Sequence, residues 1–284
     1  MPTPFFSRAR LDHIIHFSRS SEKTWARFER MGFALSPEYT FSGVASAVHS
    51  RIVNLGHTRV ELMALRPGAD VSAFPPAKTF VDARGEGLFG LALTTPDADS
   101  GLQRSRVAGI DAIGEMAFDS NTDGSTRSYT LRHYADPNVG LSYIQAAPFS
   151  VSPADAHANS VTRVQGLVYV AADPSAITPT ARFIGGDDVR QYDGALYWND
   201  RSGMELSCLS PQAFNTAYGD ALGDTRWPTA YIALIRFMYR DHDALISCLN
   251  ESGVRYSHLA PNRTIVRREG GVGVIIEFVN EAPA

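Results

Sequence analysis

The chain has 284 residues, of which 44% are hydrophobic and 20% charged, a composition typical of a globular protein with enough apolar residues for a core. The formal net charge is −4 and there is no run of lysines or arginines, so neither nucleic acid nor an anionic membrane is expected as a partner. No apolar stretch reaches the roughly 18 residues of a membrane span, and the N-terminus carries no secretory signal, which favours a cytoplasmic protein.

The first part of the chain reads as a strand, a helix and three further strands. Residues 11–17 are apolar and rich in β-forming residues, and after them Trp25, Phe28 and Met31 recur at helical spacing. Three more segments have the composition of strands, at residues 33–40, 45–55 and 57–65. The first unit is therefore βαβββ, over residues 11–67.

The same order of elements returns in residues 87–147, 161–211 and 229–281, so the sequence predicts four units. The segments that end units one and three, RVELMALRP and GMELSCLSP, are nearly the same strand. Each places a glutamate, Glu61 or Glu205, among apolar neighbours, where a carboxylate is costly unless it is paired, hydrogen-bonded or bound to a metal. This repetition indicates a repeated architecture with a polar interior.

A polar, turn-rich segment at residues 148–160 separates units two and three. We therefore predict two domains, residues 1–150 and residues 160–284, with two units in each. Residues 66–87 and 210–228 link the units at equivalent places in the two halves, and both are long for connections. Such a link can shape the mouth of a pocket or can be a surface loop.

Together these elements resemble the vicinal oxygen chelate superfamily, which includes glyoxalase I, bleomycin- and fosfomycin-resistance proteins and extradiol dioxygenases. The glyoxalase-like branch is the most similar. The resemblance spans nearly the whole chain and is carried by LDHIIHFSRSSEKTWARFERMGF, NLGHTRVELMAL, GLFGLALTTPDADSGLQRSRVAGI and AHANSVTRVQGLVYVAAD. It implies an α+β fold in which the four βαβββ units pair into two curved mixed sheets, each forming a cup, with the helices outside.

The resemblance also implies a metal site, because ligands in this superfamily come from the first and last strands of a unit. His13 and Glu61 match these positions. Since alternate residues of a strand share a face, His13 would face the cup and His16 the outer helices. A histidine with a carboxylate suits Zn, Ni, Fe, Mn or Co. A hydrogen-bonded structural pair is the alternative interpretation of His13 and Glu61.

The rest of the ligand set is incomplete. The residues that match His13 in the other three units cannot coordinate an ion through their side chains: Gly90, Gly166 and Leu234. The last strands of those units offer Tyr143 or Gln145, Glu205 and Glu277. The two-histidine, one-carboxylate set of the extradiol dioxygenases is therefore not reached, which disfavours that chemistry. Glu205 and Glu277 are structural or surface carboxylates, or an acid–base pair if they converge.

Several other polar residues are candidates for substrate binding. His49 and Arg51 lie in the third strand of unit one, where alternate side chains face the cup, although an exposed strand face is the alternative. Tyr143 and Gln145 would reach the same cup from unit two. His157 and Asn159 precede the third unit and either belong to the site or cap turns.

Two functions fit these residues. The first is a metal-dependent lyase or isomerase acting on a small carbonyl, enol or hydroxylated aromatic compound, with Glu61 moving a proton. The second is a binding or resistance protein that holds a small molecule without chemistry. No phosphate-binding glycine loop occurs, so no nucleotide or flavin is expected. Cys208 and Cys248 are expected as reduced thiols, and a homodimer is left open.

Overall fold

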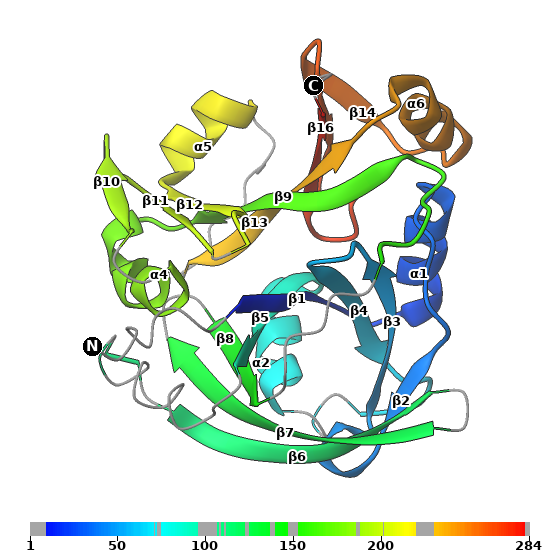
Figure 1. Cartoon of the computed structure of the whole chain (residues 1–284), viewed down its shortest axis with the longest axis vertical. Helices are drawn as coiled ribbons and strands as arrows, with labels where there is room; N and C mark the ends of the chain where they lie inside the picture. Colours follow the sequence, from blue (N-terminus) through cyan, green and yellow to red (C-terminus); the bar gives the residue numbers. More distant parts are fainter. Residues whose placement is uncertain are drawn as a thin grey trace.

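The structure of the chain is a computed structural model that describes residues 10–70, 72, 75–95, 107, 109–110, 112–122, 125–136, 140–146, 153–185, 188–200, 202–219 and 230–281. Within these ranges the strands form two separate sheets, one from each half of the chain (Figure 1).

The first sheet is a closed barrel in the order β1-β4-β3-β2-β6-β7-β8-β5. Within each unit the first strand pairs in parallel with the last strand, β1 with β4 and β5 with β8. The two units join through the antiparallel pair of β1 and β5. The strands are β1 (Arg10–Ser18), β2 (Tyr39–Phe41), β3 (Val48–Asn54), β4 (Arg59–Leu65), β5 (Gly87–Thr95), β6 (Ala112–Thr122), β7 (Ser125–Asp136) and β8 (Gly140–Ala146).

The second sheet repeats this pairing in the order β10-β11-β12-β9-β13-β16-β15-β14. Strands β9 and β12 are parallel, β13 and β16 are parallel, and β9 and β13 join the units antiparallel. The predicted α+β fold of paired βαβββ units is therefore confirmed. The strands are β9 (Val161–Val170), β10 (Arg190–Tyr192), β11 (Ala195–Asn199), β12 (Glu205–Leu209), β13 (Tyr231–Tyr239), β14 (Tyr256–Ala260), β15 (Arg263–Val266) and β16 (Ile275–Asn280).

The helices that are described within the units lie outside the sheets, as predicted (Figure 1). They are α1 (Ser21–Arg30), α4 (Thr178–Gly185) and α6 (His242–Glu251), with the short 3₁₀ turns η2 (Gly43–Ala45) and η4 (Pro174–Ile177). The helix predicted in unit two, at residues 97–109, falls almost entirely outside the described residues. Ser20 caps α1 by accepting a hydrogen bond from the Lys23 N–H, and Asp241 caps α6 in the same way from Ala244. Helix α1 buries Phe28 against the first sheet.

The two links between units form helices that pack on the concave faces, where the sequence had suggested a pocket mouth or a surface loop. Helix α2 (Pro75–Arg84) lies inside the ring of barrel strands in Figure 1 and shares an apolar cluster with them, through Ala77 and Val81. Helix α5 (Pro211–Tyr218) packs Phe214 and Tyr218 on the interior of the second sheet. Each cup therefore has one apolar end covered by its own link.

The segment before the second sheet is fastened to the first unit by two side chains. Asn159 is fully buried, donates to the Met31 carbonyl (2.9 Å) and accepts from the Val161 N–H (3.1 Å). His157 accepts through Nδ1 from the Ala34 N–H (3.0 Å). Both side chains satisfy backbone groups, and the bonds to Ala34 and Met31 join this segment to the first unit rather than capping a local turn.

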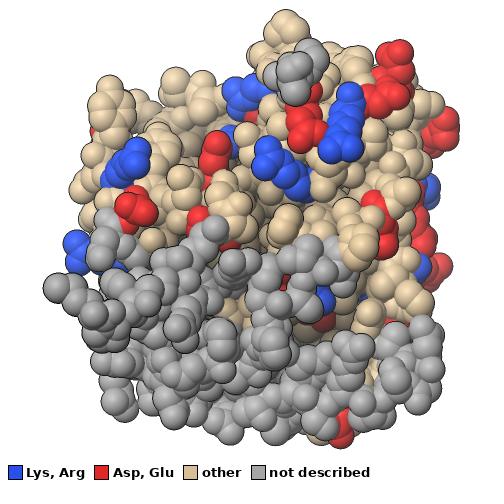
Figure 2. All heavy atoms as spheres, viewed as in Figure 1, with Lys and Arg blue, Asp and Glu red and all other residues tan. Residues whose placement is uncertain are grey.

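Cys208 and Cys248 are free thiols, as predicted. No helix in the part of the chain that the structure describes is long and apolar enough to cross a membrane. Among the described residues on the face shown in Figure 2, basic and acidic side chains are interspersed.

Candidate functional site

The repeated glutamates occupy the same place in the two sheets. Backbone pairing aligns one residue from each of the four central strands of a sheet in a row. In the first sheet the row, in the strand order β4, β1, β5 and β8, is Glu61, Ile15, Gly90 and Leu141. In the second sheet the corresponding row, in the order β12, β9, β13 and β16, is Glu205, Gly166, Arg236 and Glu277. Each row therefore places one or more charged side chains at the same level of its sheet.

In the first cup, His13 and Glu61 meet as predicted. His13 Nε2 lies 3.2 Å from Glu61 Oε2, and the two side chains are 20% and 12% exposed. The residues two positions further along, Ile15 and Met63, pack in the apolar cluster inside the barrel, which shows that this face of β1 and β4 points inward. His16 lies on the opposite face, fully buried, as expected of a core residue.

Two more charged residues hold this pair. His13 Nδ1 lies 2.7 Å from Asp12 Oδ2, and Arg59 donates a hydrogen bond to the same carboxylate oxygen. Burial alone would lower the pKa of His13, but its hydrogen bonds to Asp12 and Glu61 and their negative charges raise the pKa to about 9. Burial would raise the pKa of Glu61, and the hydrogen bond and positive charge of His13 lower it instead. The pair is therefore an ion pair at neutral pH.

These residues fit part of a metal site. Both His13 Nε2 and Glu61 Oε2 are ligand atoms, and Asp12 on His13 Nδ1 is the carboxylate that commonly orients a ligating histidine. Backbone pairing places Tyr143 beside Ala92 and Ala92 beside His13. The side chains of Tyr143 and Gln145 lie outside the described part of the chain. Among the residues that are described, no group of three or more His, Cys, Asp or Glu side chains is arranged to hold an ion.

His49 and Arg51 do not face the cup, so that expectation is wrong. The Trp25 ring of α1 lies 4.8 Å from the His49 ring. Arg51 donates to Glu29 of α1 (2.6 Å) and to the Ser36 carbonyl (2.7 Å). These contacts place both side chains on the outer face of β3, under the helix. The inward residues of β3 are Ser50 and Ile52, since Ile52 pairs with Glu61.

The second cup contains an arginine between the two predicted carboxylates. Arg236 donates through Nε to Glu277 Oε2 (2.6 Å) and through Nη1 to Glu205 Oε2 (3.1 Å). A Cβ at Gly166, in the same row, would lie 2.5 Å from the Glu205 carbonyl oxygen, so only glycine fits there. Burial alone would lower the pKa of Arg236, but the charge of Glu277 raises it. The guanidinium therefore fills the position that a cation shared by these carboxylates would take.

Three residues at the centre of this cup were not predicted from the sequence: Arg236, Arg263 and Tyr218. Leu234 was expected at the position that faces the site, whereas the register places Arg236 beside Glu277. A signal was present, because Arg236 is the one charged residue in the apolar strand YIALIRFMY. A lone charge in such a strand indicates a buried partner.

Comparison with known proteins gives a family and a fold. The model of the glyoxalase-like domain matches residues 11–182. No curated protein matches the chain by sequence. A hypothetical protein from Staphylococcus aureus is 9% identical with a TM-score of 0.62, and the alignment covers 96% of this chain and 100% of that one. A mutant 4-hydroxymandelate synthase from Streptomyces coelicolor is 11% identical with a TM-score of 0.60, covering 98% and 94%.

A third structure has the same fold within a longer chain. It is a fusion of a xylose isomerase-like TIM barrel with a 4-hydroxyphenylpyruvate dioxygenase, 13% identical with a TM-score of 0.57. The alignment covers 98% of the present chain and 50% of the fusion protein. At these identities the likeness shows a shared fold and does not extend to the reaction.

Proposed function

The chain belongs to the glyoxalase-like domain family, and from this premise we propose that it is a metal-dependent enzyme of the lyase or isomerase type. Its partner would be a small carbonyl, enol or hydroxylated aromatic substrate. The observation that carries the proposal is the 3.2 Å contact between His13 Nε2 and Glu61 Oε2, two ligand atoms brought together from different strands inside a cup. A divalent ion held by these atoms would act as a Lewis acid toward the substrate oxygens.

The surrounding residues prepare the pair for this role. His13 would release its Nε2 proton when an ion binds, and Asp12 would then accept a hydrogen bond from the remaining proton on Nδ1 and so leave Nε2 free to coordinate. Arg59 holds Asp12 in place. Glu61 would be the carboxylate that accepts a proton from the substrate. Helix α2 covers the apolar end of the cup and excludes water from that side.

A non-catalytic binding protein is the second candidate. The observation in its favour is that the described residues of the first cup supply one histidine and one glutamate as ligands, while the carboxylates of the second cup are bound by arginine. An extradiol-type dioxygenase is the weakest candidate, since its site needs a second histidine and the side chains described in the first cup include one histidine.

Metal analysis tests the proposal. Protein purified without chelator is expected to carry close to one divalent ion per chain, or to bind Zn, Ni, Fe, Mn or Co when these are added after EDTA treatment. Changing His13→Ala or Glu61→Gln should weaken ion binding about tenfold or more. His57→Ala is the matched control, because His57 is exposed. If all three variants bind ions as the parent does, or if no ion binds, the binding protein is favoured.

A further inference from the structure

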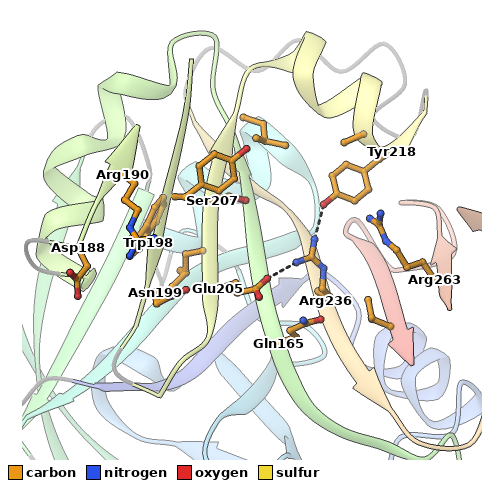
Figure 3. Close-up of a pocket in the computed structure, with 15 residues that line it drawn as sticks. Gln165, Asp188, Arg190, Trp198, Asn199, Glu205, Ser207, Tyr218, Arg236 and Arg263 are labelled. Carbon is orange, nitrogen blue, oxygen red and sulfur yellow. Dashed lines mark hydrogen bonds and ion pairs between the residues drawn. The ribbon is translucent and has the colours of Figure 1, made fainter. Parts of the chain in front are cut away.

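The second cup contains an open cavity of about 730 Å³, a volume suited to a small organic molecule. It lies on the concave face of the second sheet, between strands β11, β12, β13 and β15 and helix α5 (Figure 3). Polar side chains gather at its centre, where Arg236 lies between Glu205 and Tyr218 with Arg263 beside them.

The cavity holds two guanidinium groups on one buried carboxylate. Glu277 is fully buried, and each of its oxygens is taken: Oε2 by Arg236 (2.6 Å) and Oε1 by Arg263 Nε (2.6 Å). One carboxylate neutralises one positive charge. A second positive charge therefore remains to be balanced inside the cavity, by groups other than Glu277.

The second counter-ion in contact with these two arginines is Glu205, and it is held weakly. Arg190 and Asp188, one charge of each sign, line the cavity near β10 and β11 (Figure 3). The Glu205 side chain is 56% exposed and contacts Arg236 Nη1 at 3.1 Å, whereas the Arg236 side chain is 18% exposed. Exposed ion pairs of this kind contribute about 0.2–1 kcal/mol, so another anion can displace Glu205 at little cost. Arg263 is 34% exposed, and its Nη1 donates to none of the residues that the structure describes.

The cavity also offers flat apolar surface beside these charges. Tyr197 is 42% exposed at one wall and presents an exposed ring face. Tyr218 is 5% exposed, with its ring packed on Phe214 and 5.7 Å from the Arg263 guanidinium. The Tyr218 hydroxyl accepts a hydrogen bond from Arg236 Nη2 (2.8 Å) and so fixes the orientation of that guanidinium. A planar anion could stack on the Tyr197 ring while its oxygens meet the arginines.

We propose that this cavity binds a small organic carboxylate with a flat apolar body, and that the ligand carboxylate replaces Glu205 on Arg236 and engages Arg263. The guanidinium fork pairs with the two oxygens of a carboxylate. The site is separate from His13 and Glu61 and requires no metal ion. It therefore goes beyond the proposed reaction of the first cup and can be tested without it.

Calorimetric titration of the full chain provides the test, with benzoate, phenylacetate and cinnamate as probes and benzamide as the neutral isostere of benzoate. At least one carboxylate should bind with a dissociation constant below about 10 mM, and benzamide should bind at least about tenfold more weakly than benzoate. Inorganic phosphate should bind more weakly than the best carboxylate. No carboxylate binding, equal binding of benzamide, or tighter binding of phosphate would overturn the proposal.

Substitutions of Glu205 and of Arg263 should change the affinity for carboxylates in opposite directions. Glu205→Gln removes the competing carboxylate and should tighten carboxylate binding about two- to fivefold. Arg263→Met should weaken it about tenfold or more, while Arg263→Lys, which keeps the charge for buried Glu277, should weaken it less. Weaker binding by the Glu205 variant would show that the network is only structural and would sink the proposal.

Two controls separate this site from the rest of the molecule. Arg240→Met removes an arginine that is 73% exposed and paired with Glu281 outside the cavity, so carboxylate affinity should not change. His13→Ala should remove ion binding and leave carboxylate affinity as it was. If His13→Ala abolishes carboxylate binding in folded protein, the ligand lies in the first cup and the assignment to the second cup is wrong.

Discussion

Different cations neutralise the repeated glutamates, and this difference decides what each cup can bind. Glu61 is paired with a histidine, His13, which can give up its proton so that a ligand nitrogen becomes available. Glu205 and Glu277 are paired with Arg236, which keeps its charge at any pH at which the protein folds. The first cup can therefore exchange a proton for an ion, whereas the second presents a permanent cation to an anion.

His16 predicts a loss of stability in mild acid. It is fully buried, its Nε2 donates to the Val272 carbonyl (2.6 Å), and burial lowers its pKa to about 4. In the unfolded chain the pKa is about 6.5, so below that pH the unfolded state takes up a proton that the folded state refuses. The free energy of unfolding should fall between about pH 6.5 and pH 4, by about 3 kcal/mol in all.

The measurement compares urea unfolding of the parent and His16→Gln at several pH values. The parent should lose up to about 1.4 kcal/mol more per pH unit in this window than the variant, and the two slopes should agree above pH 7. The difference isolates His16, because the other titratable groups are common to both proteins. Equal slopes throughout the acid range would show that His16 takes up its proton as readily when folded as when unfolded.

Residue alternation predicted the first and fourth strands of the barrel correctly and the third strand wrongly. In β4 the outward face is apolar, at Val60, Leu62 and Ala64, so the inward position of Glu61 can be read from the pattern. In β1 the outward Ile14 is followed by the polar His16 and Ser18, and the inward position of His13 follows from its alternation with Ile15 and Phe17. In β3 both faces carry polar residues, and helix α1 provides partners for the outward ones, Trp25 over His49 and Glu29 for Arg51. Polarity alone therefore does not tell which face of such a strand meets the cup.

The elements inside each unit follow from local patterns, while the two link helices depend on their surroundings. Helix α5 begins with a capping serine, Ser210, which accepts from the Ala213 N–H (3.1 Å), and with Pro211 in its first turn. This start signal is present in the sequence. Helix α2 is only ten residues long and begins with two prolines, and burial of Ala77 and Val81 in the barrel holds it. Its position inside the cup is a tertiary effect that no short segment encodes.

The segment that enters the second sheet predicts a strong effect for a single amide. Asn159→Ala removes two hydrogen bonds and leaves the Met31 carbonyl and the Val161 N–H without their present partner. Because the site is fully buried, the loss should be about 2–4 kcal/mol in the free energy of unfolding measured by urea. Asn250→Ala is the control, since Asn250 is exposed and its side chain accepts a single hydrogen bond, from Tyr256. Equal effects of the two substitutions would contradict the fastening role.

At the scale of the whole molecule, the repeated units were predictable and their contact was not. The boundary near residues 148–160 follows from composition, and strands on either side of it form separate sheets. Yet the largest apolar cluster draws on both halves: the ring of Phe33 lies 5.1 Å from that of Phe237 and 6.4 Å from that of Phe278. In the sequence Phe33, Phe237 and Phe278 are apolar residues like many others. The hydrophobic pattern therefore does not predict that they pack against each other between the two halves. Division into two domains stays a prediction.

Such a shared core predicts that the chain unfolds in one cooperative step. Scanning calorimetry should give a single transition with equal calorimetric and van't Hoff enthalpies. Phe33→Ala, at the contact between halves, and Phe214→Ala, within the second sheet alone, should each cost about 3–5 kcal/mol and lower the midpoint of the entire transition. If the halves are independent, Phe214→Ala will instead lower one part of the transition and leave the remainder at its original temperature, because the first sheet would no longer depend on the second.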